Sequence, residues 1–309
     1  MRRRRIQVIF FVAVILLAGR VMGQEDPRDV ERWFRFLLSR TDELRAQSDE
    51  MSGDTSPAAE KRFHAFERRL ENDYKHFLND HPKHTRAMVA YGDYLSDLGR
   101  EEEAMTWWKK AITIDPKEAY AYNDIANYYG HNGRAADALK LYDKAIELVP
   151  TEPVFRFNWA TTCVCFRNES KTVYGWTKDE IFQHSLGQFR KARDLDPQNF
   201  DLSTAYAETF YMMPKPDWEE AYAAWKYCLG QPLDDDQRQL VFMHLARVCI
   251  HLQRYQEAQE WTTKLPANSP LHRALERRIT RGNQTNSTPT RTTVPTTSAP
   301  DPGARSTRP

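Results

Sequence analysis

The sequence predicts an all-α protein built from repeated pairs of helices. Two consecutive segments of 34 residues, 85–118 and 119–152, can be laid over each other so that glycines, alanines and prolines coincide. A fixed period of this length is typical of helical repeat arrays, in which each unit packs on its neighbours. Only 12 glycines occur in 309 residues, which is too few for many tight β-turns, and 28% of the residues are charged. This composition suits helices that bury one face and expose the other.

The first 23 residues differ from the rest and have the layout of a secretory signal. Arg2–Arg5 is basic, residues 6–18 are mostly apolar, and residues of small or medium size precede Gln24. We therefore expect cleavage before Gln24 and a chain that is periplasmic or secreted. The alternative is an uncleaved anchor formed by residues 6–18, although 13 apolar residues fall short of the roughly 20 that a membrane-spanning helix needs.

Residues 24–84 predict two amphipathic helices that form an N-terminal cap or a degenerate repeat. The first spans about Asp26–Ser48, and the second runs from about Pro57 to Asn79. Tyr74 in the second helix lies 34 residues before Trp108, so this helix behaves like the second half of an earlier repeat. Terminal repeats are often atypical because one of their faces meets solvent.

The two clear units, 85–118 and 119–152, each predict a helix, a glycine turn and a second helix that ends before a proline. Glycine can adopt the left-handed conformation that closes a helix, and Gly99 and Gly133 are placed for this role. The second unit is the more regular one. Its diagnostic residues are Ile125, Ala126, Tyr129, Gly133, Ala138, Tyr142, Ala145 and Pro150.

These residues resemble the tetratricopeptide repeat, in which large and small side chains recur at these positions. The resemblance implies a right-handed α-solenoid of helix-turn-helix repeats. It also implies a concave groove, formed by the first helix of each pair, that serves as an interaction surface. In this packing the small residues let the two helices approach, so a bulky residue at Ala138 or Ala145 would overpack the contact.

Three further units are expected after the regular pair, followed by a cap and a tail. The third contains an insertion at 167–177, which we predict to be a mostly polar loop carrying Tyr174 and Trp176. The tail contains Thr, Ser, Pro and Arg without aromatic residues, a composition that favours disorder. The predicted segments are 153–199, 200–233 and 234–268 for the repeats, 269–280 for a capping helix and 281–309 for the disordered tail.

The four cysteines form no CxxC pair, and we expect buried thiols rather than a disulfide framework. If one bridge exists, Cys228–Cys249 is the favoured pair, because these residues fall on helices that should be neighbours.

The sequence indicates neither an enzyme nor a cofactor or metal protein. It lacks a phosphate-binding loop and the common hydrolase and metalloprotease motifs. The formal net charge of +1 provides no broad basic field, so nucleic acid is not an expected partner. His81 and His84 flank Pro82 at a repeat boundary, where polar residues are ordinary.

We predict an interaction scaffold that binds an unidentified protein or peptide in its groove. Asn side chains can hydrogen-bond to an extended backbone, and a Tyr ring can pack beside it. The alternative is a membrane-tethered assembly factor that self-associates as a homo-oligomer, with the membrane involved only if the N-terminal segment is uncleaved. The candidate groove residues are Arg86, Asp93, Tyr120, Asn123, Asn127, His131, Phe157, Thr161 and Glu208, with Val89, Thr204, Met243 and Arg247 at further inner-face positions.

Overall fold

A computed structural model describes residues 26–51, 56–267 and 269–287. These residues form helices and turns and contain no β-strand, which confirms the predicted all-α class. The predicted signal at 1–23 and the predicted tail from residue 288 onward lie outside the described residues. Within the described ranges, no helix is long and apolar enough to cross a membrane.

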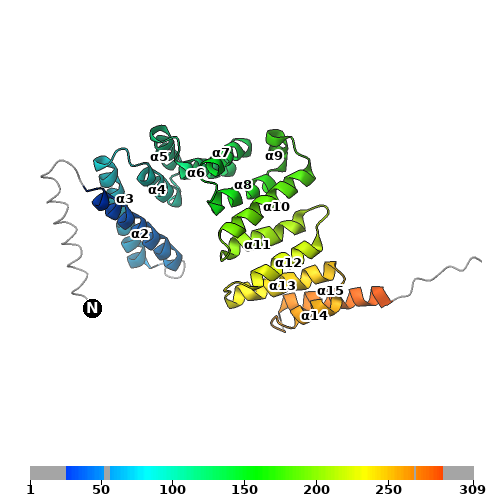
Figure 1. Ribbon diagram of the computed structural model, residues 1–309. Coiled ribbons are helices and arrows are strands. Elements are labelled where there is room, and N and C mark those ends of the chain that lie inside the picture. The colour runs from blue at the N-terminus through cyan, green and yellow to red at the C-terminus, as the bar shows by residue number, and fades with distance from the viewer. Residues whose placement is uncertain (1–25, 52–55, 268, 288–309) are drawn as a thin grey trace, which may run out of the picture. The chain divides into compact units, whose positions relative to one another are not determined.

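The chain divides into two compact units, with the boundary between Pro197 and Gln198. Unit 1 contains α2 (Pro27–Met51), α3 (Pro57–Asp80), α4 (Thr85–Asp97), α5 (Glu101–Ile114), α6 (Ala119–His131), α7 (Ala135–Leu148), α8 (Pro153–Cys165), α9 (Arg167–Tyr174) and α10 (Lys178–Leu195). Unit 2 contains α11 (Phe200–Thr209), the 3₁₀ helix η1 (Phe210–Met212), α12 (Trp218–Leu229), α13 (Asp235–His251), α14 (Tyr255–Thr262) and α15 (Pro270–Ser287). Within each unit, consecutive helices pack side by side as pairs (Figure 1).

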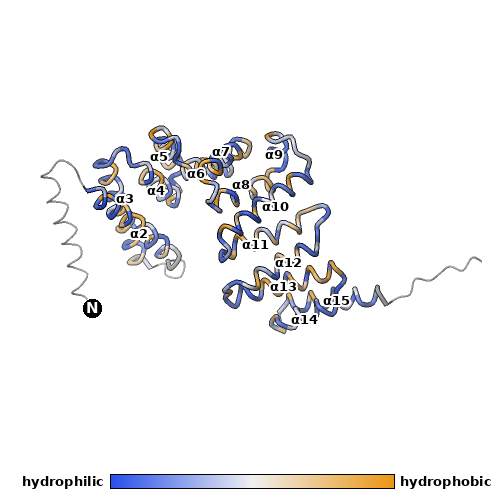
Figure 2. Tube along the Cα trace, in the orientation of Figure 1, coloured by the Kyte–Doolittle hydropathy of each residue, from blue (hydrophilic) through white to orange (hydrophobic). Residues whose placement is uncertain are grey.

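Each pair packs through small residues on its first helix. Gly92 and Ala126 occupy the same position one repeat apart, and both are buried. A Cβ atom at Gly92 would lie 2.4 Å from Trp108 Nε1, so this glycine makes room for the indole. In the second repeat the smaller Tyr142 occupies the position of Trp108, so the alanine Ala126 fits at the position of Gly92. Apolar and polar residues alternate along the helices, as this one-sided burial requires (Figure 2).

The turn inside a pair has the same backbone form in three repeats. Gly99 and Gly133 have φ angles of 71° and 72°, as predicted for left-handed turn residues. Gln253 adopts φ 59° at the equivalent place between α13 and α14, although it carries a side chain. In each case the next residue donates its backbone N–H to a carbonyl near the end of the first helix, and Arg254 does so to Cys249 at 2.8 Å.

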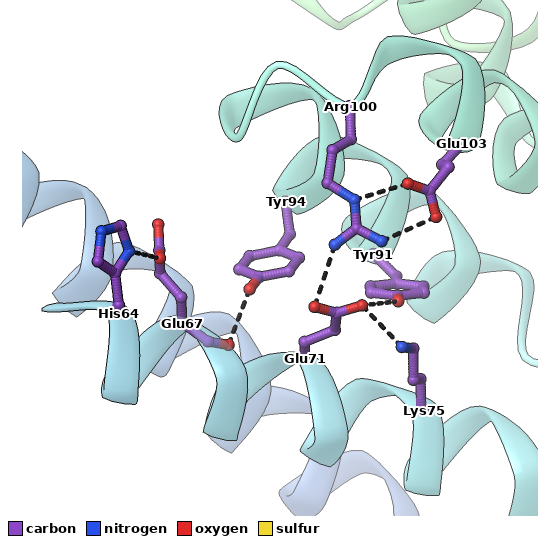
Figure 3. Close-up of polar contacts among 8 residues, drawn as sticks. All are labelled: His64, Glu67, Glu71, Lys75, Tyr91, Tyr94, Arg100 and Glu103. Carbon is purple, nitrogen blue, oxygen red and sulfur yellow. Dashed lines mark hydrogen bonds and ion pairs between the residues drawn. The ribbon is translucent and has the colours of Figure 1, made fainter. Parts of the chain in front are cut away.

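The N-terminal helices are tied to the first regular repeat by an aromatic core and a polar cluster. Tyr74 of α3 stacks on Tyr91 of α4 with their ring centroids 5.3 Å apart. Beside this core, Glu71 of α3 accepts hydrogen bonds from Tyr91 and Lys75 and pairs with Arg100 at 3.0 Å (Figure 3). Arg100 also pairs with Glu103 of α5 at 2.7 Å. The side chains in Figure 3 therefore join α3 to α4 by hydrogen bonds of Tyr91 and Tyr94, and Arg100 joins α3 to α5 by ion pairs.

The structure differs from the sequence prediction in the insertion and at the end of the C-terminal helix. The insertion is not a loop, because residues 167–174 form α9, which ends at the left-handed Gly175. The C-terminal helix does not end at residue 280 but continues to Ser287, so the first seven residues assigned to the disordered tail are helical. A Cβ at Gly282 would lie 2.2 Å from the Tyr255 ring, so this stretch packs closely against α14. The first proline of the tail, Pro289, follows the end of the helix.

The cysteines are present as thiols in the described chain, and no bridge joins Cys228 to Cys249. Cys163, Cys228 and Cys249 are buried, whereas Cys165 is exposed. Burial raises the pKa of Cys249 to about 12, so this thiol is not reactive at neutral pH.

Candidate functional site

A cavity of about 270 Å³ opens between α4, α5 and α6 of unit 1. Two of these helices are the first helices of neighbouring repeats, so the cavity lies at the predicted groove. The third, α5, closes it with the Trp108 indole. The lining residues are Asp93, Ser96, Asp97, Glu101, Trp108, Asp124, Asn127, Tyr128 and His131.

Two carboxyl groups face each other in this cavity. Asp93 Oδ1 accepts a hydrogen bond from Trp108 Nε1 at 3.0 Å, and Asp124 Oδ1 accepts one from Asn123 Nδ2 at 3.0 Å. The two carboxyl groups also lie close enough for each to influence the protonation of the other. Burial raises the pKa of Asp93 to about 6. Burial and then the charge of Asp93 raise the pKa of Asp124 well above its ordinary range.

The cavity carries more negative than positive charge. Asp97 at the rim pairs with Arg45 of α2 at 2.8 Å. Glu101 accepts a hydrogen bond from Ser96 at 3.3 Å. Among the described residues, neither Asp93 nor Asp124 nor Glu101 forms an ion pair with a basic side chain. A cation entering the cavity would therefore meet carboxylates without a bound counter-ion.

The structure brings only three of the predicted groove residues into the cavity, namely Asp93, Asn127 and His131. Asn127 accepts a hydrogen bond from Tyr142 at 2.6 Å, which orients its amide. The cavity residues that were missed come from the end of α4, from α5 or from the flank of α6. Glu101 is one of them, because an acidic residue at a helix start has an ordinary structural explanation.

Asn123 does not present a free amide to the groove. Its side chain is 5% exposed and accepts a hydrogen bond from Asn158 Nδ2 at 2.9 Å. Because the same amide also donates to Asp124, its hydrogen-bonding capacity is largely used between repeats. Tyr120 is the opposite case, since it is 47% exposed and its hydroxyl donates to Glu152 at 2.6 Å.

The remaining predicted groove residues are spread around the cavity or lie outside unit 1. Arg86 pairs with Glu31 at 3.3 Å and lies over Phe34. Phe157 packs edge-on against Phe189, and Thr161 is half-buried. Glu208 belongs to α11 of unit 2 and is not part of this cavity.

Tyr174 and Trp176 contact the protein itself rather than standing free for a partner. Their rings stack with centroids 4.3 Å apart, and Trp176 stacks on His184 at 3.9 Å. The Tyr174 hydroxyl donates to Asp143 of α7 at 2.7 Å. These contacts hold α9 against the preceding repeat, which explains why two large aromatic residues occur in a polar insertion.

In the described part of the chain, no group of three or more His, Cys, Asp or Glu side chains could hold a metal ion.

Comparison with known proteins agrees with the repeat assignment. Residues 92–133 match the TPR repeat family, and residues 119–148 match the tetratricopeptide repeat family. Comparison with curated proteins gave no match.

Solved structures show the same fold at low sequence identity. The C-terminal part of a TPR repeat-containing protein from Cytophaga hutchinsonii has a TM-score of 0.53 at 14% identity, covering 80% of this chain and 98% of that one. PilW, a type IV pilus biogenesis factor, has a TM-score of 0.51 at 16% identity, covering 77% and 98%. YrrB, a TPR protein with an unusual peptide-binding site, has a TM-score of 0.51 at 14% identity, covering 66% and 97%. The repeat pattern, the helix pairs and these matches establish that the chain is a tetratricopeptide repeat protein.

Proposed function

We propose that the protein is a non-enzymatic scaffold that binds an extended segment of a partner protein along the groove of unit 1. A Lys or Arg side chain of that segment enters the cavity beside Asp93 and Asp124. The observation that carries this proposal is the pair of half-buried carboxyl groups that form no ion pair with a basic side chain of the described chain.

The chemistry of the cavity favours a basic side chain over other groups. A bound ammonium or guanidinium can form charge-assisted hydrogen bonds with the two carboxyl groups in their ionised form. Trp108 and Tyr128 offer aromatic surface to the aliphatic part of a lysine or arginine. An anionic or purely apolar side chain would leave the carboxylates uncompensated.

The surface beside the cavity suits the rest of a peptide. Tyr120 and Val154 occupy the same position one repeat apart and are 47% and 45% exposed. Such exposed apolar surface can pack against neighbouring side chains of a bound segment. YrrB, which has the same fold, has a peptide-binding site, and this supports the class of ligand without identifying it.

A charge-matched peptide titration tests the proposal. Fluorescein-labelled hexalysine would be titrated with the purified chain, with the variant Asp93→Asn/Asp124→Asn, and with the control Glu102→Gln/Glu147→Gln. The control removes two exposed carboxylates from α5 and α7, so both variants change the net charge equally. We expect the cavity variant to bind hexalysine at least about tenfold more weakly, a loss of roughly 1.4 kcal/mol, while the control changes little.

Equal losses in both variants would show that hexalysine responds to overall charge, and this would contradict the proposed site. Unchanged binding by the cavity variant would contradict it as well. Thermal melting of each variant verifies that the chain remains folded.

We also propose that the protein acts outside the cytoplasm. The support is the signal-like sequence of residues 1–23. N-terminal sequencing of the chain isolated from its native host tests this, because a start at Gln24 agrees with export. A start at Met1 in the membrane fraction would contradict cleavage and favour the membrane-tethered alternative.

A further inference from the structure

Unit 2 carries an aromatic and basic face of its own around Arg247 of α13. The guanidinium carbon of Arg247 lies 4.7 Å from the centre of the Tyr211 ring. Tyr211 packs against Trp218 with ring centroids 5.6 Å apart, and Trp218 stacks on His251 at 4.0 Å with an interplanar angle of 8°. Arg247, Tyr211 and Trp218 are half-buried, so this face is a partly desolvated aromatic platform with a cation on it.

A second guanidinium, that of the exposed Arg278, acts electrostatically on residues of the same platform. The pKa of His251 is lowered by burial and then by the positive charges of Arg278 and Arg247. Both arginines also influence the Tyr211 hydroxyl, whose pKa burial raises. Arg278 projects from α15, so this face combines side chains from η1, α12, α13 and α15.

Neither arginine is neutralised by the described part of the chain. No carboxylate there forms an ion pair with Arg247 or Arg278, whereas many other arginines of the protein do pair, such as Arg254 with Glu219. Glu208 interacts electrostatically with Arg247, but the two side chains do not come within ion-pair distance. Burial raises the pKa of Glu208. A half-buried guanidinium without a counter-ion is a favourable site for an incoming carboxylate.

We propose that this face binds an acidic peptide segment. A side-chain carboxylate of the peptide pairs with Arg247 and Arg278, and the adjoining backbone and apolar groups pack on Tyr211 and Trp218. The planar guanidinium of Arg247 can bind a carboxylate through two parallel hydrogen bonds, and its cation–π contact with the Tyr211 ring holds it in place. This site is independent of the acidic cavity in unit 1 and would select the opposite charge.

The outer face of α15 offers a matched control. Arg273 and Arg277 on that face are exposed. A nearby hollow there is lined by polar and charged residues of α15 alone, without any aromatic side chain. Removing these two charges changes the net charge of unit 2 as much as removing Arg247 and Arg278, but leaves the aromatic platform intact.

Fluorescein-labelled hexaglutamate would be titrated with the purified chain, with Arg247→Gln/Arg278→Gln and with Arg273→Gln/Arg277→Gln. We expect the first variant to bind at least about tenfold more weakly and the second to keep most of its affinity. Arg247→Lys keeps the charge but loses the two-pronged geometry, and it should also weaken binding. Circular dichroism and thermal melting check that all three variants fold.

Equal weakening by the two double variants would overturn the proposal, because it would indicate a diffuse basic surface. Unchanged binding in Arg247→Gln/Arg278→Gln would overturn it directly. Inorganic phosphate that competes as well as unlabelled hexaglutamate would overturn the assignment to a peptide. Hexalysine binding should be unaffected in all these variants, so this proposal and the function proposed for unit 1 can fail separately.

Discussion

The groove faces of unit 1 and unit 2 share one packing scheme but carry opposite charge. Asp93 of α4 and Arg247 of α13 each lie six residues before the left-handed turn residue of their helix pair, Gly99 or Gln253. Asp93 belongs to a cavity with three further carboxyl groups, whereas Arg247 lies on an aromatic platform where the charge of Arg278 also acts on His251. The same place in the repeat therefore carries a carboxylate in one unit and a guanidinium in the other.

The difference shows which parts of a repeat are constrained by packing. In every helix pair, the residue just before the groove position is small and buried. The pairs of packing and groove residues are Gly92–Asp93, Ala126–Asn127, Ala160–Thr161, Ala207–Glu208 and Ala246–Arg247. The first member of each pair lets two helices approach, while the second lies toward the groove and differs in charge from one pair to the next. Binding preference can therefore differ between units built on the same backbone.

The largest predicted effect is a loss of stability in unit 1 that unit 2 does not share. Gly92→Ala places a methyl group 2.4 Å from Trp108 Nε1 and should destabilise unit 1 by about 3 kcal/mol, because the indole has to move. The double variant Gly92→Ala/Trp108→Tyr reproduces the pair found at Ala126 and Tyr142 and should recover much of this loss. Urea denaturation measures both changes.

Gly92→Ala also tests the independence of the two sites. Hexalysine binding should decrease, since Trp108 lines the cavity, while hexaglutamate binding should persist. Loss of both activities would contradict the assignment of the sites to separate units. A double variant as unstable as Gly92→Ala would show that the indole is not the cause of the strain.

A second, smaller effect concerns the pH dependence of stability. The folded-state pKa of Asp93 is about 6, against an ordinary value of 3.8, so the folded chain holds a proton that the unfolded chain releases between these values. Stability should therefore fall as pH rises from about 4 to about 6 and then level off. Asp93→Asn keeps the acceptor for Trp108 but cannot ionise.

This variant should be more stable than the parent at pH 7 by about 1–2 kcal/mol, with little difference at about pH 4. It should also bind hexalysine more weakly, so that stability and binding change in opposite directions. Urea denaturation across this pH range is the measurement. A variant that is less stable at pH 7 would contradict the raised pKa of Asp93.

The smallest predicted effect compares the turns of the two units. Gln253 adopts the left-handed conformation that glycine adopts at Gly133, which costs a residue with a side chain about 1–2 kcal/mol. Glycine removes this cost but loses more backbone entropy on folding, so Gln253→Gly should stabilise unit 2 by a net amount of about 0.5–1 kcal/mol. The reverse change Gly133→Gln should destabilise unit 1 by a similar amount. Denaturation midpoints that move in the same direction for both variants would be inconsistent with equivalent turns.

The fold was largely predictable because packing repeats in the sequence. Ala126, Gly133 and Ala145 recur at fixed spacing, and this regularity identified the helix pairs of both units. The composition of residues 281–287 was misleading, because Ser, Thr and Arg suggested a tail although Gly282 packs against Tyr255. The insertion was misread for a similar reason, since its helix is held by Tyr174 on Asp143, a contact between distant positions.

The candidate site was less predictable because side chains from different helices complete it. The repeat register placed Asp93 and Asn127 on the groove, but it gave no sign that Trp108 of the second helix closes a cavity beside them. Asn123 was expected to meet a partner, yet Asn158 of the next repeat binds its amide. Such pairings depend on which residues happen to meet across repeats, and the period alone does not specify them.

Photo-crosslinking most directly tests the central claim that the two units select opposite charges. Hexalysine and hexaglutamate, each carrying one photoreactive group, would be crosslinked separately to the purified chain and the attachment sites mapped by peptide mass spectrometry. Hexalysine crosslinks are expected near the cavity residues Asp93–His131, and hexaglutamate crosslinks are expected on unit 2 near Tyr211, Arg247 and Arg278. Attachment of both peptides to the same unit, or crosslinks scattered over the surface, would contradict it.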